Sequence, residues 1–168
     1  MQAYVDAYRE IMQQCKEEGL QFDYIFLASS TNATQAGLTV GKLLSGDRTD
    51  IVGISVNRGK NRGRDVLPKD VVRYFNEKQY RLPENWEDSI IFSDEYLSGG
   101  FGKYDSNIEG TIAKMYQENG IPLDPIYTGK GFYGMIEYLK KNQISEKNVL
   151  FWHTGGTPLF FDYLIEKE

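Results

Sequence analysis

The part of this sequence best suited to chemistry is an apolar stretch that ends in small hydroxyl and amide side chains. Residues 22–28 are apolar and rich in aromatic side chains, which is typical of a buried strand. Residues 29–34, with the sequence SSTNAT, follow at once, and residues 38–44 have the pattern of a helix. A strand, a tight polar loop and a helix gather free N–H groups and the positive end of a helix dipole at one point, which favours a phosphate. An ordinary capped loop fits the same residues, because helix N-caps select them too.

Two further polar loops occupy comparable positions. Residues 128–131 end a short stretch at 124–131 that we expect to be extended before the helix at 132–142, and residues 153–157 follow the expected last strand. Parallel α/β sheets bind ligands beyond the carboxyl ends of their strands, so we expect these loops to meet the loop at 29–34.

The elements that would position these loops alternate along the chain. Apolar strands without an in–out pattern, separated by helices, are typical of a parallel sheet covered on both sides. We therefore predict an α/β fold of three layers, with a mostly parallel sheet flanked by helices. The expected helices are 3–18, 34–45, 69–78 (started by Pro68), 107–119, 132–142 and a C-terminal one, and the expected strands are 22–28, 50–56, 89–92 and 148–153.

Composition restricts the classes of function. The chain has 168 residues and a net charge of −5, which fits one domain and argues against nonspecific nucleic-acid binding. One Cys and one His leave little for a disulfide or a transition-metal site, and suggest a reducing compartment. No apolar run approaches the roughly 20 residues that span a bilayer, and the N-terminus lacks the features of a signal peptide. We expect a cytoplasmic protein with no metal, nucleic-acid or membrane partner.

A basic, glycine-containing stretch at 57–66 admits two interpretations. Its Arg and Lys side chains could contact an anionic ligand, but we expect a solvated connection between elements.

Five motifs, in this order, resemble the C-terminal half of one enzyme family. The similarity runs from about residue 3 to the end, and the family is the pyridoxal-phosphate enzymes that include D-cysteine desulfhydrase and 1-aminocyclopropane-1-carboxylate deaminase. The resemblance implies the tryptophan-synthase-β-like fold (fold type II), with residues 1–168 as a single, incomplete α/β domain equivalent to the C-terminal part of the large cofactor domain. The motifs are TNATQAG at 31–37, Tyr104 with EGT at 109–111, DPIYTGK at 124–130, Gly134-Met135, and HTGGTP at 153–158.

The resemblance also implies roles for individual residues. Tyr127 and Tyr104 are similar to the two active-site tyrosines near the substrate, where a phenol can donate to a carboxylate or move a proton. Gly155 and Gly156 would let the backbone pack closely against the cofactor ring. The residues similar to the loop that grips the cofactor phosphate are Ser30, Thr31, Asn32, Ala33 and Thr34.

Thr128 is similar to the residue that partners the ring nitrogen of the cofactor, and this position separates the subgroups. The cyclopropane deaminases have Glu there, which keeps the ring protonated, whereas a neutral hydroxyl favours β-elimination. The resemblance therefore favours desulfhydrase chemistry, in which D-cysteine gives pyruvate, sulfide and ammonia, with deaminase activity of the complete protein as the alternative. Lys130 matches a non-catalytic lysine, and His153 fits either a pocket position or a structural one.

In this family the lysine that forms a Schiff base with the cofactor lies in the N-terminal half, which has no counterpart here. We therefore expect non-covalent cofactor binding at most, and no activity from this chain alone. It would be a fragment or half-protein, either self-associated as a homo-oligomer or dependent on a missing N-terminal half, with a small amino acid as substrate of the complete protein.

Two other functions remain open at the level of sequence. A flavodoxin-like FMN-binding protein also has a Thr- and Asn-rich phosphate loop after a strand, and matches this length and acidity. A non-enzymatic module that binds a phosphate compound would fit the missing lysine.

Overall fold

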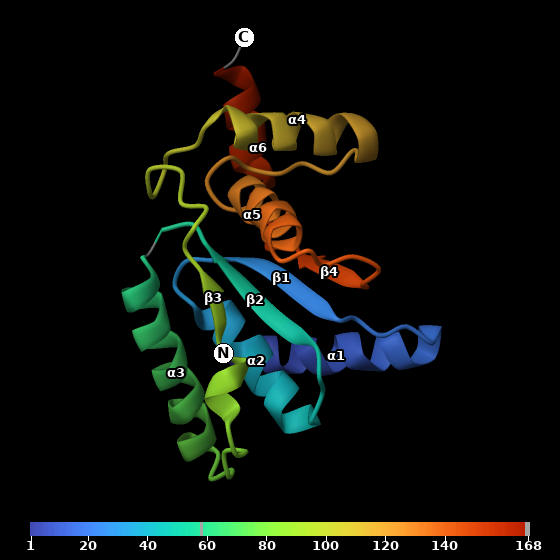
Figure 1. Cartoon of the computed structure of the whole chain (residues 1–168), viewed down its shortest axis with the longest axis vertical. Helices are drawn as coiled ribbons and strands as arrows, with labels where there is room; N and C mark the ends of the chain where they lie inside the picture. Colours follow the sequence, from blue (N-terminus) through green and yellow to red (C-terminus); the bar gives the residue numbers. More distant parts are fainter. Residues whose placement is uncertain (58, 167–168) are drawn as a thin grey trace.

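A four-stranded sheet lies between two groups of helices (Figure 1). The computed structural model describes residues 1–57 and 59–166, without the side chains of residues 60–64. The elements, in chain order, are α1 (Gln2–Glu18), β1 (Tyr24–Ser29), α2 (Ala33–Ser45), β2 (Asp50–Ser55), α3 (Lys60–Glu77), η1 (Trp86–Ser89), β3 (Ile91–Ser93), α4 (Ser106–Asn119), α5 (Thr128–Lys141), β4 (Val149–Trp152) and α6 (Thr157–Ile165).

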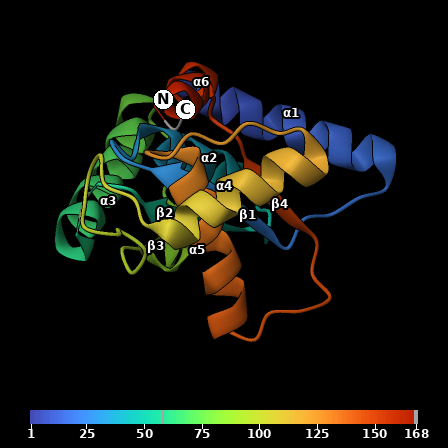
Figure 2. The same ribbon diagram turned by 90° about the horizontal axis from the view of Figure 1, so that it is seen from above.

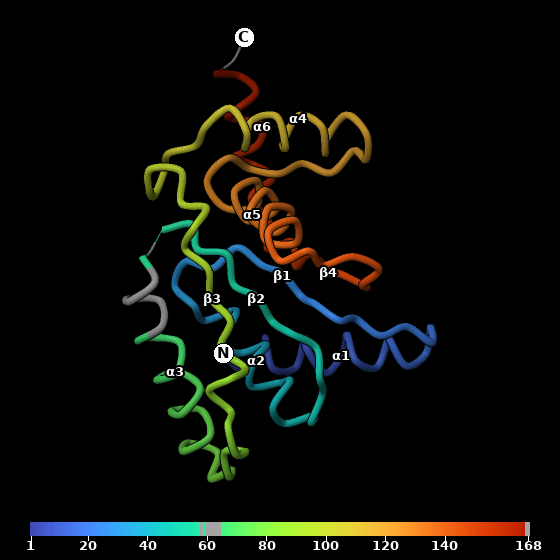
Figure 3. The backbone as a smooth tube through the Cα atoms, viewed as in Figure 1, coloured from blue at the N-terminus to red at the C-terminus, as the bar shows by residue number. Residues whose placement is uncertain are grey.

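The sheet is parallel throughout, which confirms the expected α/β class. Its strand order is β3-β2-β1-β4, so the first strand of the chain is central. Tyr24 pairs with Asp50 on one side and with Val149 on the other. Since the strands are parallel, the chain leaves β1, β2 and β3 at the same end of the sheet (Figure 3). The loops that could bind a ligand therefore begin side by side.

Apolar side chains on both faces of the sheet produce the three expected layers. On one face Ile25, Leu27 and Ile51 pack against Tyr8 of α1 and Leu38 of α2. On the other face α5 covers β1 and β2, and α4 lies across α5 (Figure 2). A separate cluster joins α4 and α6, formed by Ile108, Ile112, Leu123, Phe160 and Tyr163.

A buried glutamine links the start of α2 to the end of β1 and the beginning of β3. Gln35, in the first turn of α2, has no exposed surface, and its Nε2 donates to the carbonyl oxygen of Ile91 in β3 at 2.7 Å. The Ser29 hydroxyl at the end of β1 lies 3.0 Å from Gln35 Oε1. The amide crosses β2 at Gly53, where a methyl group would overlap it. The start of α2 is thereby fixed to the sheet edge that carries the candidate site.

Helix α3 is longer than the sequence predicts. The expected loop at 57–66 is helical from Lys60, with residue 58 outside the described residues, and Pro68 lies inside the helix rather than at its start. A proline removes one backbone hydrogen bond from a helix interior. Burial of Leu67, Val71 and Phe75 in one cluster offsets that loss, because their spacing places all three on one face.

The start of α5 and the position of β3 also differ from expectation. Residues 124–127 form a turn instead of an extended stretch, and α5 begins at Thr128, so residues 128–131 are its first turn rather than a loop. The strand expected at 89–92 is displaced by η1 to Ile91–Ser93. The other elements start and end within two residues of their expected positions.

No described helix combines the length and apolar character that crossing a bilayer requires. Likewise, no group of three or more described His, Cys, Asp or Glu side chains could hold a metal ion.

We expect Gly53→Ala to destabilise the protein by about 2 kcal/mol, because the new methyl group displaces the Gln35 amide from Ile91 and Ser29. Gln35→Ala alone should cost a similar amount, since it leaves the Ile91 carbonyl without its donor. In the double variant the methyl group enters space that the glutamine has vacated. The loss of stability in the double variant should therefore be smaller, by at least about 1 kcal/mol, than the sum of the losses in the two single variants. Urea unfolding of the four proteins measures this coupling, and strict additivity would contradict the proposed contact.

Candidate functional site

Segments that follow different strands meet at the carboxyl edge of the sheet. The N–H of Val56 donates to the carbonyl oxygen of Ser29 at 3.2 Å, which joins the segments after β2 and β1. A Cβ added to Gly131, in the first turn of α5, would lie 2.9 Å from Cβ of Ala28 in β1. The predicted phosphate loop and the start of α5 are therefore neighbours.

The turn between β1 and α2 has the features of an anion site. Asn32 adopts a left-handed backbone conformation with φ of 72° at the N-cap of α2, and its side chain makes no capping hydrogen bond to the helix. Asn32 Oδ1 lies 3.1 Å from the Ser29 hydroxyl instead. Thr31 is exposed, and Ser30, Ala33 and Thr34 are partly exposed. The positive end of α2 is thus not capped by Asn32, and the turn around it reaches the surface.

A buried carboxylate organises the start of α5. Asp124 has no exposed surface. Its Oδ1 accepts from the backbone N–H groups of Ile126 (2.9 Å) and Tyr127 (2.7 Å). Its Oδ2 accepts from the N–H (2.9 Å) and the hydroxyl (2.7 Å) of Thr128. The Asp124 carboxylate therefore satisfies the N–H groups of the turn that leads into α5 and that of the first residue of the helix.

Thr128 is fully buried and belongs to this network. Its hydroxyl oxygen also accepts from the backbone N–H of Asp124 at 2.8 Å. A hydroxyl has one proton and two lone pairs. Because the Thr128 hydroxyl donates to Asp124 Oδ2 and accepts from the Asp124 N–H, one of its two lone pairs is not used in these contacts.

The glycine pair after β4 packs onto the same carboxylate. Gly155 and Gly156 have φ of 104° and 95°, and a side chain at Gly156 would overlap the Asp124 carboxylate. A pocket of about 360 Å³ opens here. It combines two predicted sites, since Tyr127 and the glycine pair share it. Its lining consists of Asp124, Tyr127, Thr154, Gly155, Gly156 and Leu159.

His153, the single histidine of the sequence, connects the loop after β4 to the segment that precedes Asp124. Its Nδ1 accepts from the N–H of Gly155 at 3.2 Å, and its Nε2 lies 3.0 Å from the carbonyl oxygen of Pro122. These contacts fit a neutral ring with the proton on Nε2. Of the two interpretations from the sequence, this geometry supports the structural one.

The two predicted tyrosines have different neighbours. Tyr127 is partly buried, and its ring is in edge contact with the ring of Phe101 at a centroid distance of 6.0 Å. Tyr104 is in edge contact with Tyr163 of α6, 5.8 Å away, beside the α4–α6 cluster. The aromatic partner of Tyr127 is therefore Phe101.

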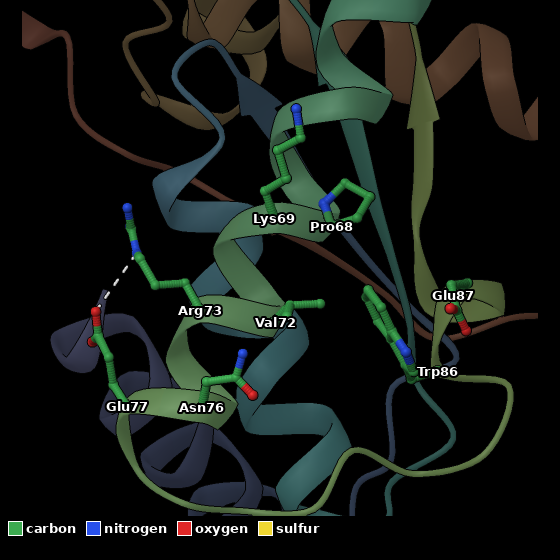
Figure 4. A pocket seen from close by; sticks show the side chains of 8 residues that line it. All are labelled: Pro68, Lys69, Val72, Arg73, Asn76, Glu77, Trp86 and Glu87. Carbon is green, nitrogen blue, oxygen red and sulfur yellow. Dashed lines mark ion pairs between the residues drawn. The ribbon is translucent and has the colours of Figure 1, made fainter.

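A larger hollow lies away from these loops, between α3 and η1 (Figure 4). It measures about 530 Å³, with Val72 and Trp86 facing each other across it. Arg73 and Glu77 on its wall form an ion pair of 3.9 Å. None of the loops at the carboxyl edge contributes to it, so volume alone does not identify the site.

Comparison with known proteins identifies the family. The family model described as "Pyridoxal-phosphate dependent enzyme" matches residues 1–155. This chain belongs to that family. The flavodoxin-like alternative is thereby set aside, and the cofactor of the family is the one that the motifs imply.

The relatives of this chain within the family include proteins named as deaminases and as D-cysteine desulfhydrases. A Pyrococcus furiosus protein provisionally named a 1-aminocyclopropane-1-carboxylate deaminase is 34% identical over 163 residues, covering 95% of this chain and 47% of the relative. The D-cysteine desulfhydrase of Klebsiella pneumoniae is 33% identical over 161 residues, covering 95% and 48%. The chain thus spans about half the length of the curated relatives it matches.

Solved structures agree with the family assignment. The crystal structure of an ACC deaminase homologue superposes with a TM-score of 0.83 at 30% identity, over 97% of this chain and 47% of that one. The crystal structure of a threonine deaminase from T.th. superposes with a TM-score of 0.54 at 12% identity, over 88% and 54%, and supports the fold alone.

Two residues of this candidate site, Asp124 and Phe101, have no role assigned to them from the sequence. Asp124 has a recognisable signal, since Asp before Pro favours the start of a turn. Phe101 has no such signal, because its contact with Tyr127 depends on the path of a glycine-rich loop.

Gly155 and Gly156 provide a matched pair of substitutions. Gly155→Ala places a side chain at positive φ in open space and should cost about 1 kcal/mol of stability. Gly156→Ala has the same backbone penalty and also drives a methyl group into the Asp124 carboxylate, so we expect a further loss of about 2 kcal/mol. Chemical denaturation of both variants measures the difference. Equal losses would show that the Gly156–Asp124 contact does not constrain the loop.

Proposed function

We propose that residues 1–168 form the part of a fold-type-II pyridoxal-phosphate site that holds the phosphate and the ring-nitrogen side of the cofactor, within a lyase most like D-cysteine desulfhydrase. The observation that carries this proposal is the start of α2, where Asn32 turns the backbone without capping the helix. Family membership adds support, because the cofactor of the family has both a phosphate and a flat ring.

The phosphate would be held by the turn at residues 30–34. Helix N-terminal N–H groups and the hydroxyls of Ser30, Thr31 and Thr34 are suitable donors to a dianion. Gln35 stabilises this arrangement, because its hydrogen bond to Ile91 fixes the first turn of α2 to β3. The phosphate could therefore bind without reorganising the helix.

Thr128 is the proposed partner of the ring nitrogen. Pyridoxal phosphate supplies an electron sink for bond breaking next to the amino group of an amino acid. Thr128 carries no charge of its own, and its hydroxyl, which donates to Asp124 here, would have to turn to the ring nitrogen in order to donate to it. A neutral partner at this position supports loss of a good leaving group, such as sulfide, better than ring opening, which would be the task of a deaminase.

Tyr127 is the proposed catalytic tyrosine, with Tyr104 the second candidate. The phenol of Tyr127 lines the 360 Å³ pocket beside Gly155 and Gly156, where it could donate to the carboxylate of an amino acid or move a proton. Tyr104 packs on Tyr163 and does not line this pocket, so it has less support than Tyr127.

The covalent attachment of the cofactor would come from outside this chain. Lys130 is fully buried, and its Nζ donates hydrogen bonds to backbone carbonyl oxygens. Burial and these hydrogen bonds make Lys130 unsuitable as a Schiff-base lysine. We propose that the active form needs a second polypeptide segment or a self-associated state, that the substrate is a small amino acid, and that this chain alone is inactive.

A carboxylate at position 31 tests the phosphate site. Thr31→Asp should weaken pyridoxal-phosphate binding at least about tenfold, since one added negative charge beside the phosphate opposes a dianion by about 1.4 kcal/mol or more. The same carboxylate favours the helix dipole of α2, so thermal stability should be unchanged or higher. Titration calorimetry and thermal unfolding of the same samples measure the two effects.

The matched control is Ser106→Asp, which adds the same charge at the first position of α4. It should leave the affinity within about twofold. Equal weakening by both substitutions would indicate nonspecific binding, and no weakening by Thr31→Asp would exclude the phosphate turn.

Borohydride reduction tests the mode of attachment. With one equivalent of pyridoxal phosphate, reduction followed by intact-mass measurement should give no stoichiometric pyridoxyl adduct, and peptide mapping should find Lys130 unmodified because it is buried. Exposed lysines such as Lys103 serve as the reference for background reaction. A stoichiometric adduct on any one lysine of this chain would overturn the proposal of non-covalent binding.

A further inference from the structure

A buried lysine binds three backbone carbonyl oxygens, from two segments of the chain, at once. Lys130 is the third residue of α5 and has no exposed surface. Its Nζ lies 2.8 Å from the carbonyl oxygen of Gly100, 3.0 Å from that of Leu97 and 3.5 Å from that of Val56. Two of these oxygens belong to the loop after β3, and the third follows β2. The ammonium has three N–H donors, and it has a carbonyl oxygen for each of them.

Backbone carbonyls, rather than an acid, compensate this charge. No described carboxylate is within ion-pair distance of Lys130 Nζ, although Asp105 is near enough to interact electrostatically. Burial lowers the pKa of Lys130, and the attraction of Asp105 partly opposes this change. Burial also tends to raise the pKa of Asp105, but hydrogen bonds from Ser98 and from the N–H groups of Ile108 and Asn107 outweigh it and lower that pKa.

The loop that Lys130 binds has an unusual backbone. Ser98, Gly99, Gly100 and Gly102 all have positive φ, between 46° and 106°. Within the loop, the N–H of Gly100 donates to the carbonyl oxygen of Leu97 at 3.0 Å, and the N–H of Lys103 donates to that of Gly100 at 3.3 Å. The ammonium binds the same two carbonyl oxygens. It therefore stabilises a turn that local sequence alone would leave with many alternatives.

The tip of this loop reaches the candidate site. Phe101 follows Gly100 directly, is 55% exposed, and has its ring against Tyr127. An exposed aromatic side chain in a glycine-rich loop has little packing of its own to hold it. The Lys130–Gly100 hydrogen bond restrains the backbone at the residue directly before Phe101.

We infer that Lys130 is a positioning residue. Its ammonium group stabilises the turn at residues 97–100 through hydrogen bonds, and this turn keeps the Phe101 ring in contact with Tyr127. The functional importance of this contact rests on the proposed role of Tyr127, whereas the contact itself does not. Lys130 acts on the site through the loop and does not touch the proposed ligand.

Loss of the ammonium should release the loop. In Lys130→Met, amide exchange of Gly100 and Lys103 should accelerate at least about tenfold, and the NMR cross-relaxation between the Phe101 and Tyr127 rings should be lost. The control is Lys42→Met, which removes a comparably buried lysine of α2 that pairs with Asp50 at 3.4 Å. It should leave both signals unchanged. Unchanged signals in Lys130→Met would overturn the inference.

Chemical rescue separates the charge from the packing of the side chain. Lys130→Ala removes the atoms of an n-propylammonium ion, so that ion should restore the slow amide exchange, while neutral n-propanol should not. Equal restoration by both compounds would show that Lys130 acts by filling space, and no restoration by either would contradict a role for the free cation.

A measurement on the unmodified chain decides the question if the variants do not fold. An ammonium with three carbonyl partners exchanges its protons slowly, so Lys130 should give a resolved ¹⁵N-ammonium NMR signal near neutral pH. Absence of that signal would contradict the three-carbonyl geometry. None of these readouts includes pyridoxal phosphate. Negative results would therefore contradict the role of Lys130 without bearing on the proposed cofactor site. Conversely, a failure to bind the cofactor would not contradict the role of Lys130.

Discussion

The Asp124 carboxylate is the interaction on which the candidate site depends. It accepts hydrogen bonds from Ile126, Tyr127 and Thr128, and so fixes where α5 begins. Gly156 lies against the same group, which sets the distance between the start of α5 and the loop after β4. A buried carboxylate with this many donors resists any rearrangement that would leave it unpaired. Tyr127 and the glycine pair are therefore presented to the pocket by one shared constraint.

The opposite side of the site is organised without charge. Gln35 connects α2 to β1 and β3 through amide and hydroxyl hydrogen bonds, while Asn32 supplies the left-handed turn. The N-cap residue of α2 is uncharged, so the cap adds no formal charge at the positive end of the helix dipole. A dianionic group would meet a dipole and hydroxyls there, and a buried polar network that holds their geometry.

Much of this could be predicted from the sequence, because local pattern determines it. The apolar stretch of β1 and the small polar residues after it specify a strand, a turn and a helix, and the family motifs follow in register. The errors arose where distant contacts decide. Pro68 was assigned to a helix start, but core packing extends α3 through it. The start of α5 was placed too late, because Pro125 favours extended backbone in isolation, whereas Asp124 caps a turn there. The turn next to Phe101 is hydrogen-bonded by a lysine 30 positions away from Gly100 in the sequence, which no local pattern reveals.

The strand order has a consequence for biosynthesis. The central strand β1 is synthesised before its neighbour β4, so Tyr24 has no pairing partner on that side until Val149 has been added. At roughly 5–20 residues per second, this edge of the nascent sheet lacks its native neighbour on the order of ten seconds. During that interval an apolar strand with unpaired backbone groups is open to other chains or to chaperones. Slower translation between α2 and β4 would lengthen this interval of exposure.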